Sequence, residues 1–274
     1  MIKKAFKSVI RKLGYDVVRY TMNRQYGCPP DFEKRHIEII ERVKPYTITS
    51  NERLHALIES IRFILLNGIK GDFVECGVYK GGSMMAVALT LLAESANDRE
   101  LYLFDTFEGM PKPGEKDIDL RGNPAIKKFS QTRLSDMSST WLNASLEDVK
   151  EVMTLSKYPM ERIHFVKGLV EDTIHKNAPK SIALLRLDTD WYQSTKHELI
   201  HLYPRVSPKG IIIVDDYGHF KGQREAVDEF FLENNMSPFL HRIDYTGRLI
   251  VKEGNCPNRR AKRTGKSAIA KLVR

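Results

Sequence analysis

Paired acidic residues follow two short apolar runs in the second half of the chain. They are Asp188 and Asp190 after Ile182–Leu187, and Asp215 and Asp216 after Ile211–Val214. Runs this short and this rich in Ile, Leu and Val are typical of buried parallel strands, whose neighbours lie about 5 Å apart. We therefore expect the carboxylates to converge at one edge of a sheet, where their mutual repulsion requires a cation, a shared proton or an Arg or Lys partner.

The chemistry that such a cluster favours is metal-assisted activation of a hydroxyl group. Mg²⁺ prefers carboxylate oxygens and keeps open positions for a substrate. A cation that binds two adjacent oxygens would orient a hydroxyl and lower its pKa, and a carboxylate beside it could take the proton. His219 follows the second acid pair and is a further candidate base, although a surface histidine, or one that only supports the residues of the site, is the favoured interpretation. Asp190, Trp191 and Tyr192 could line an acceptor pocket, although the two aromatic residues also suit ordinary packing.

A glycine-rich turn lies between an expected strand and an expected helix in residues 71–93. The strand is Asp72–Cys76, and the helix is Ser83–Ala93 with Ser83 as its N-cap. Glycines let the backbone approach a nucleotide-like ligand, and the start of a helix offers free N–H donors. The spacing Glu75-x-Gly77-x-x-x-Gly81 is neither the dinucleotide-binding pattern nor a P-loop. It is closest to the E/D-x-G-x-x-x-G turn of S-adenosylmethionine-dependent methyltransferases, a short pattern that also arises by chance.

Two further acids follow expected strands. Asp105 comes after Leu101–Phe104, where an acid can accept hydrogen bonds from both hydroxyls of a ribose; a helix N-cap or turn residue is the alternative. Asp172 lies in the loop after Ile163–Val166. There it could bind an adenine amino group or cap a helix, and the sequence favours neither.

The remaining pattern predicts an α/β domain at residues 51–252, built on a mostly parallel sheet flanked by helices. Residues 106–161 interrupt the alternation of strands and helices with Gly, Pro and charge, and we expect a lid over the cofactor and acceptor there. The other expected elements are helices at Phe32–Val43, from Asn51 to Leu65, at Ser145–Leu155, Ser194–Tyr203 and Gln223–Phe231, a turn at Ser207–Gly210, and closing strands at Phe239–Arg242 and Leu249–Lys252.

Composition and charge bound the class of protein. The 274 residues, 42% of them hydrophobic, suffice for one large α/β domain with appendages or for two small domains. The chain has 44 basic and 35 acidic residues. Positions 1–20 hold six basic residues and one acidic residue, and positions 252–274 hold eight basic residues and one acidic residue. The positions between these two ends therefore hold 30 basic and 33 acidic residues. This slightly acidic middle argues against a nucleic-acid groove in the domain. Three widely spaced cysteines favour reduced thiols in the cytoplasm, and no apolar run approaches the roughly 20 residues of a transmembrane helix.

The basic character is concentrated at the two ends of the chain. Within residues 1–50, an amphipathic N-terminal helix is expected, with its apolar side formed by Ile2, Phe6, Ile10, Leu13 and Val17. Such a helix would dock on the domain or on a second subunit, as in a homo-oligomer, or it would lie on an anionic membrane surface. Residues 253–274 form a basic tail that we expect to be frayed or bound to a partner.

Six stretches between residues 70 and 232 together resemble the macrocin O-methyltransferase family (TylF type), which acts on sugar hydroxyls of macrolide antibiotics and related glycans. They are GDFVECGVYKGGS, LYLFDTFEGMP, FVKGLVEDTI, LLRLDTDWYQST, LYPRVSPKGIIIVDDYG and GQREAVDEFF. Their order and spacing make the joint match far more specific than any single motif. The resemblance implies a class I methyltransferase fold, with a Rossmann-like sheet of seven strands, S-adenosylmethionine as donor and a bound Mg²⁺.

The resemblance also implies roles for individual residues. The metal ligands would be Asp188, Asp215 and Asp216, with Asp188 also acting as the general base. The donor site would include Glu75, Gly77 and the ribose-binding Asp105; the adjoining Gly81, Ser83 and Asp172 complete our expected set. Thr189 departs from the family, which often has Gly between the two acids, and its side chain would narrow the turn there.

We accordingly expect a cytoplasmic, Mg²⁺-dependent O-methyltransferase that transfers a methyl group from S-adenosylmethionine to a hydroxyl of a sugar or glycosylated natural product. One alternative is a methyltransferase that acts on another polyol, on a catechol-like acceptor or on nucleic acid. The other is a non-catalytic module of the same fold that docks on a membrane or a complex through its basic ends. Acids at all three strand ends argue against this last alternative.

Overall fold

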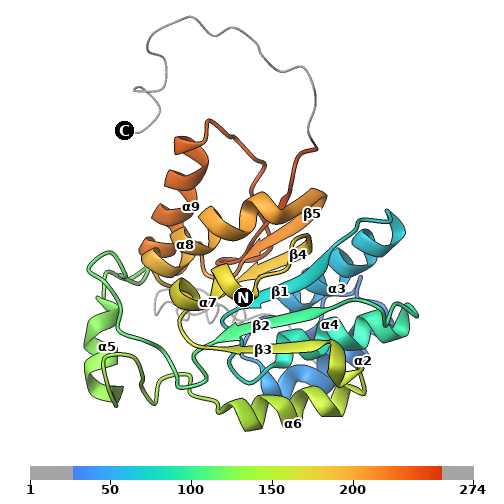
Figure 1. The fold of residues 1–274 in the computed structure, drawn as a ribbon, viewed down its shortest axis with the longest axis horizontal. Helices are drawn as coiled ribbons and strands as arrows, with labels where there is room; N and C mark the ends of the chain where they lie inside the picture. Colours follow the sequence, from blue (N-terminus) through green and yellow to red (C-terminus); the bar gives the residue numbers. More distant parts are fainter. Residues whose placement is uncertain (1–26, 255–274) are drawn as a thin grey trace, which may run out of the picture.

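The computed structural model describes residues 27–254, and a seven-stranded sheet runs through this part of the chain (Figure 1). Its order is β3-β2-β1-β4-β5-β7-β6; β7 is antiparallel to β5 and β6, and the other pairs are parallel. The strands are β1 (Asp72–Cys76), β2 (Leu101–Asp105), β3 (Ile163–Lys167), β4 (Ile182–Leu187), β5 (Val206–Val214), β6 (His241–Arg242) and β7 (Arg248–Val251). The expected fold class, a mostly parallel Rossmann-like sheet, is confirmed.

Helices cover both faces of the sheet. One layer contains α2 (Lys34–Val43), α3 (Asn51–Leu66), α4 (Gly82–Ala93) and α6 (Leu146–Ser156). The other contains α7 (Val170–Asn177), α8 (Tyr192–Leu202) and α9 (Lys221–Glu233). Helix α5 (Ala125–Thr132) lies to one side of the sheet, at the left of Figure 1.

The alternation of side chains along the central strands builds a separate core on each face. On β1, Phe73 packs into the core beneath α3 and α4, whereas Val74 packs into the core beneath α8 and α9. The same period of two places Glu75 of β1 on the α3 side, where it pairs in register with Arg186 of β4. Two opposite charges therefore face each other inside the sheet, directly below its carboxyl edge.

The elements follow the sequence pattern closely, with differences at their ends. Ser145 caps α6 through a capping box, as its spacing to Asp148 predicts. The expected N-cap role of Ser83 is wrong, because Gly81, in a left-handed conformation, is the N-cap of α4 and Ser83 lies within the first turn. The expected turn at Ser207–Gly210 lies inside β5, which begins at Val206.

Two expectations concern membranes and the chain ends. Between residues 27 and 254, none of the helices combines the length and the apolar character that crossing a bilayer would require. The expected amphipathic helix in residues 1–20 and most of the basic tail lie outside the described residues.

Candidate active site

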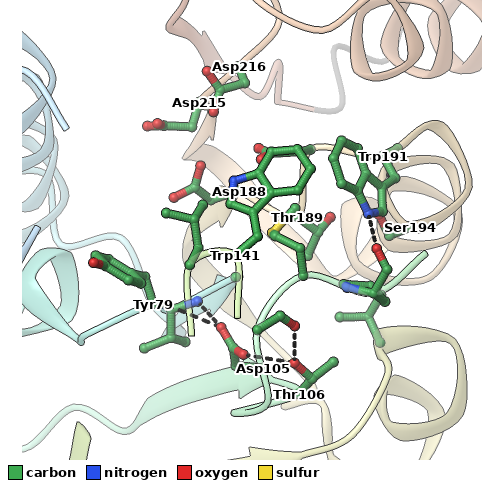
Figure 2. A pocket seen from close by; sticks show the side chains of 18 of the residues that line it. Tyr79, Asp105, Thr106, Trp141, Asp188, Thr189, Trp191, Ser194, Asp215 and Asp216 are labelled. Atoms are coloured by element: carbon green, nitrogen blue, oxygen red, sulfur yellow. Dashed lines mark hydrogen bonds between the residues drawn. The ribbon is translucent and has the colours of Figure 1, made fainter. Parts of the chain in front are cut away.

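A cavity of about 770 Å³ opens at the carboxyl ends of the parallel strands. The segments that follow β1, β2, β3, β4 and β5 all contribute to its wall. Figure 2 shows Tyr79 and Asp105 at one end and Asp215 and Asp216 at the other, with Asp188 and the Trp141 ring between them. Since parallel α/β sheets bind ligands at this edge, the cavity is the candidate site.

The end near Asp105 is built by the glycine turn after β1. Asp105 Oδ2 accepts hydrogen bonds from the backbone N–H groups of Val78 (2.6 Å) and Tyr79 (3.2 Å), and its Oδ1 accepts from the N–H of Phe107 (2.7 Å). Gly77 has a φ of +84°, and a Cβ there would collide with the Asp188 carbonyl group. The turn thus needs glycine both for its conformation and for its close approach to the segment after β4.

The predicted donor-site residues do not all reach the cavity. Gly77, Ser83, Asp105 and Asp172 line it. Gly81 faces Val149 of α6 instead, and Glu75 lies fully buried beneath the cavity against Arg186. Glu75 therefore lies beneath the cavity lining, and its expected place in the donor site stays a prediction.

The opposite end holds the acids predicted to gather there. Carboxylate oxygens of Asp188, Asp190 and Asp216 lie within 4.8 Å of one another. Asp190 has a φ of +68°, which turns its buried side chain toward the other two. Asp215 lies beside this triplet, but its carboxylate forms ion pairs with the guanidinium groups of Arg53 and Arg186. The structure thus confirms that acids from the ends of β4 and β5 converge.

Two arginines that the sequence analysis did not use bind this acidic cluster from below. Arg186 contacts Glu75 and lies 2.8 Å from Asp188 and 2.7 Å from Asp215. Arg53 of α3 contacts Asp215 and lies 3.1 Å from Asp244. The sequence does contain a signal for Arg186. Arg186 interrupts the apolar run of β4, and Glu75 interrupts the apolar run of β1; a single charge in a buried strand needs a partner of opposite charge.

Three of the buried acids, Asp190, Asp188 and Glu75, have raised pKa values. Burial, followed by the charges of Asp216 and Asp188, raises the pKa of Asp190 well above its ordinary value, and Asp190 shares a hydrogen bond with Asp216. Burial likewise raises the pKa of Asp188, although Arg186 opposes the rise. Burial raises the pKa of Glu75 to about 7, again against Arg186. Shared protons and arginines thus offset the repulsion that converging carboxylates create.

The donor set fits a hard divalent cation. All three clustered side chains offer carboxylate oxygens, the ligands that Mg²⁺ prefers. Asp190 Oδ1 is buried and has no hydrogen-bond partner, so an oxygen ligand is available there. Asp188 and Asp216 line the cavity and are partly exposed to it, which leaves positions for a substrate oxygen.

Residues of the 106–161 segment form the outer wall above the acids. The Trp141 ring packs against Trp191 with a centroid separation of 5.6 Å, and Lys128 Nζ lies 4.3 Å from the Trp141 ring centroid. The segment is anchored on α8: Trp191 Nε1 donates to the Pro111 carbonyl (3.1 Å), and the backbone N–H of Tyr192 donates to Asp117 (2.8 Å). Trp141 was missed because no periodic pattern surrounds it in the sequence.

His219 also lines the cavity, next to the acid cluster. Its Nδ1 lies 3.3 Å from the Tyr245 hydroxyl group, and its ring packs edge-on against Phe220. Of the two residues expected beside Asp190, Trp191 lines the cavity, whereas Tyr192 turns outward to Glu229, to which its hydroxyl donates (2.6 Å).

Comparisons with known proteins agree with this geometry. The family model described as macrocin-O-methyltransferase (TylF) matches residues 8–252. The chain is 31% identical to demethyldecarbamoylnovobiocin O-methyltransferase of Streptomyces niveus over 74% of each chain. It is 30% identical to mycinamicin III 3''-O-methyltransferase of Micromonospora griseorubida over 74% of this chain and 76% of the relative. The structure of the O-methyltransferase NovP superposes with a TM-score of 0.67 at 30% identity, covering 76% of this chain and 83% of NovP. The calicheamicin methyltransferase CalS11, at 17% identity and a TM-score of 0.56, shares the fold.

Proposed function

This chain belongs to the macrocin O-methyltransferase (TylF) family of S-adenosylmethionine-dependent O-methyltransferases, and we propose that its acceptor is a sugar hydroxyl of a glycosylated natural product, activated beside Mg²⁺. The family resemblance carried by the six sequence stretches is thereby confirmed. The names of two relatives support the acceptor class. One is a mycinamicin 3''-O-methyltransferase, and another methylates the 4' position of a rhamnosyl-tetracenomycin, at 31% identity over 81% of each chain, from Streptomyces olivaceus.

The single observation that carries the proposal is the position of the acid cluster relative to the glycine turn. Both line one cavity, with Asp105 and Tyr79 at one end and Asp188 and Asp216 at the other. A donor held at the glycine turn would present its methyl group toward the acids. Carboxylates in the cavity also disfavour the phosphate backbone of a nucleic acid as the acceptor.

We assign the cation to Asp188 and Asp216, which both the resemblance and the geometry select. Asp215 is the third ligand that the resemblance implies; each carboxylate oxygen has two lone pairs, so pairing with arginine does not exclude ligation. Asp190 is the competing third ligand because it completes the observed triplet. When bound, the cation would lower the pKa of a ligated hydroxyl group.

The chain's own residues supply the rest of the chemistry. Asp188 is the proposed base, with His219 as the alternative, since both face the cavity. Trp141 and Trp191 would pack on the acceptor and exclude water from the transfer. Arg186 and Arg53 would hold Asp188 and Asp215 in place as positioning residues.

A methyl-transfer screen tests the acceptor class. Purified protein, labelled S-adenosylmethionine and Mg²⁺ would be incubated with rhamnosylated and other glycosylated aromatic or macrolide compounds, with the matching aglycones, with catechols and with RNA. We expect transfer to glycosides and none to their aglycones. Transfer to aglycones or catechols with equal efficiency would contradict the sugar proposal. Mg²⁺ titrations of Asp190→Asn and Asp215→Asn identify the third ligand as the one whose loss weakens binding by roughly 10-fold or more.

A further inference from the structure

Three histidines gather between α7 and α8, away from the cavity lining. His175 lies on α7, and His197 and His201 lie one turn apart on α8. One ring nitrogen of each lies within 4.8 Å of a ring nitrogen of both others. The ring centroids are 5.3 Å apart for His175 and His197, 5.0 Å for His175 and His201, and 4.2 Å for His197 and His201.

We propose that His175, His197 and His201 form a binding site for one divalent transition metal ion, with Zn²⁺ as the best-fitting ion. Neutral imidazole is a preferred ligand of Zn²⁺, and three histidines leave a fourth tetrahedral position for water. His175 is exposed, so water reaches the site. Ligands at Zn–N distances of about 2.0 Å lie roughly 3.3 Å apart, which small side-chain rotations of the three rings would achieve.

An unpartnered nitrogen supports metal binding at this cluster. His197 Nε2 is buried and has no hydrogen-bond partner, which is uncommon for a buried polar atom. In a second group of candidate ligands in the described residues, His36, His55 and Glu59, the buried His36 Nε2 likewise makes no hydrogen bond, but a carboxylate lies beside it. There His36 Nδ1 accepts from the Glu33 N–H (3.1 Å), and His36 Nε2 lies 2.9 Å from Glu59. The paired group therefore suits an ion pair, and the α7–α8 group suits a metal.

The sequence of α8 carries the corresponding spacing. His197-Glu198-Leu199-Ile200-His201 matches the His-Glu-x-x-His pattern that places two zinc ligands on one face of a helix. Glu198, however, is fully buried and accepts from Thr189 Oγ1 (2.9 Å), so it cannot serve as a base at the histidine cluster. We therefore assign a binding role that joins α7 to α8, not a hydrolytic one.

The charged groups near the cluster include one of each sign, Asp172 beside His197 and Arg205 beside His201. Asp172 of α7 lies near enough to raise the pKa of His197, while burial and the neighbouring rings lower it overall and keep the imidazole neutral. Arg205 is the nearby positive group, and its guanidinium is bonded to the carbonyl groups of Ala178 (2.8 Å) and Pro179 (3.1 Å). Because Asp172 also lines the cavity, a metal between α7 and α8 would fix a helix whose first turn belongs to the active-site wall.

Calorimetric titration of the full-length protein with Zn²⁺, in excess Mg²⁺ to occupy the carboxylate cluster, tests the proposal. We expect one tight equivalent per chain, weakened roughly 10-fold or more in His197→Gln, His201→Gln and His175→Gln. His241→Gln, an exposed histidine on β6, is the matched control and should leave the affinity unchanged. Zn²⁺ should also raise the melting temperature of the wild type, and not that of the cluster variants.

Co²⁺ provides an independent readout of the ligands. Bound at the histidines, it should show the intense visible absorption of tetrahedral coordination, and His175→Gln should abolish that absorption. His175 is exposed, so this variant should fold even if the two α8 variants do not. Equal Zn²⁺ affinity in the wild type and His175→Gln, or only the weak absorption of six-coordinate Co²⁺, would overturn the site.

Discussion

Arg186 Nη1 lies 2.8 Å from Asp188 Oδ2, and it reaches this acid from within the buried strand β4. Asp188, the proposed base and metal ligand, thus forms an ion pair with a cation that belongs to the sheet itself. Burial alone would lower the pKa of Arg186, but the carboxylates of Asp188, Asp215 and Glu75 raise it well above its ordinary value. Arg186 therefore stays charged and fixes the side of Asp188 that does not face the cavity.

Replacing Arg186 tests whether the buried network supports the fold. Arg186→Met leaves Glu75, Asp188 and Asp215 without their shared cation, so we expect a loss of about 3–5 kcal/mol in the free energy of unfolding, measured by urea denaturation. Arg62→Met is the control, because Arg62 pairs with Glu59 and Glu94 nearer the surface and should cost about 1 kcal/mol or less. Equal stability of the two variants would show that the network contributes little.

Two glycines with similar backbone conformations, Gly77 and Gly122, differ in whether a side chain would have room. Gly77→Ala should abolish measurable S-adenosylmethionine binding, because its Cβ would push the glycine turn away from the backbone of Asp188. Gly122 has a similar φ of +87° but open space around it, so Gly122→Ala should cost about 1–2 kcal/mol of stability and leave donor affinity intact. Calorimetry with the donor and thermal unfolding check both; normal donor binding by Gly77→Ala would refute the argument.

Much of the site could be predicted because strand order and side-chain period decide it. Asp188 and Asp216 meet because β4 and β5 are neighbours, as two Ile/Leu-rich runs joined by a helix suggest. The arginines could not be assigned, because Arg53 reaches the acids from α3, and only the packed structure shows that α3 covers this face. Asp190 was expected among the converging acids, but its place in the close triplet instead of Asp215 depends on its left-handed backbone, which no residue pattern specified.

Other differences have local causes. Ser83 was expected to cap α4, but the glycine at position 81 adopts the left-handed conformation and begins the helix earlier. Helix α5 was not predicted, because its eight residues carry only Ala125 and Phe129 as buried positions. The histidine cluster has a sequence signal in the spacing of His197 and His201, yet its third member comes from α7 and depends on how the helices pack.

Glu198 predicts a pH dependence of stability. Burial raises the pKa of Glu198 well above its ordinary value of 4.5, so the folded protein retains a proton that the unfolded chain releases above pH 4.5. This costs stability progressively as pH rises from about 4.5 toward the folded-state pKa. Glu198→Gln removes the cost, so its melting temperature should exceed that of the wild type by a margin that is larger at pH 8 than at pH 5. A margin that is constant with pH would mean that Glu198 is ionised in the folded state.

Trp141 tests the role of the segment above the acids. Trp141→Ala removes the ring that packs on Trp191, so we expect the KM for the glycoside acceptor to rise about tenfold, equivalent to about 1.4 kcal/mol, with donor affinity unchanged. Leu134→Ala, in the same segment but 64% exposed, should leave both constants unchanged. Steady-state kinetics distinguishes the cases, and a Trp141→Ala enzyme with wild-type KM would place the acceptor elsewhere.

The most direct test of the account measures methyl transfer to an identified glycoside with Mg²⁺, with EDTA, and with Mg²⁺ restored, in the wild type and in Asp188→Asn. We predict that EDTA abolishes transfer reversibly and that Asp188→Asn is inactive in Mg²⁺. By calorimetry, the wild type in EDTA and Asp188→Asn in Mg²⁺ should both bind S-adenosylmethionine with nearly the affinity of the wild type in Mg²⁺. Full transfer in EDTA, or an active Asp188→Asn enzyme, would contradict a metal-assisted reaction at the carboxylate cluster.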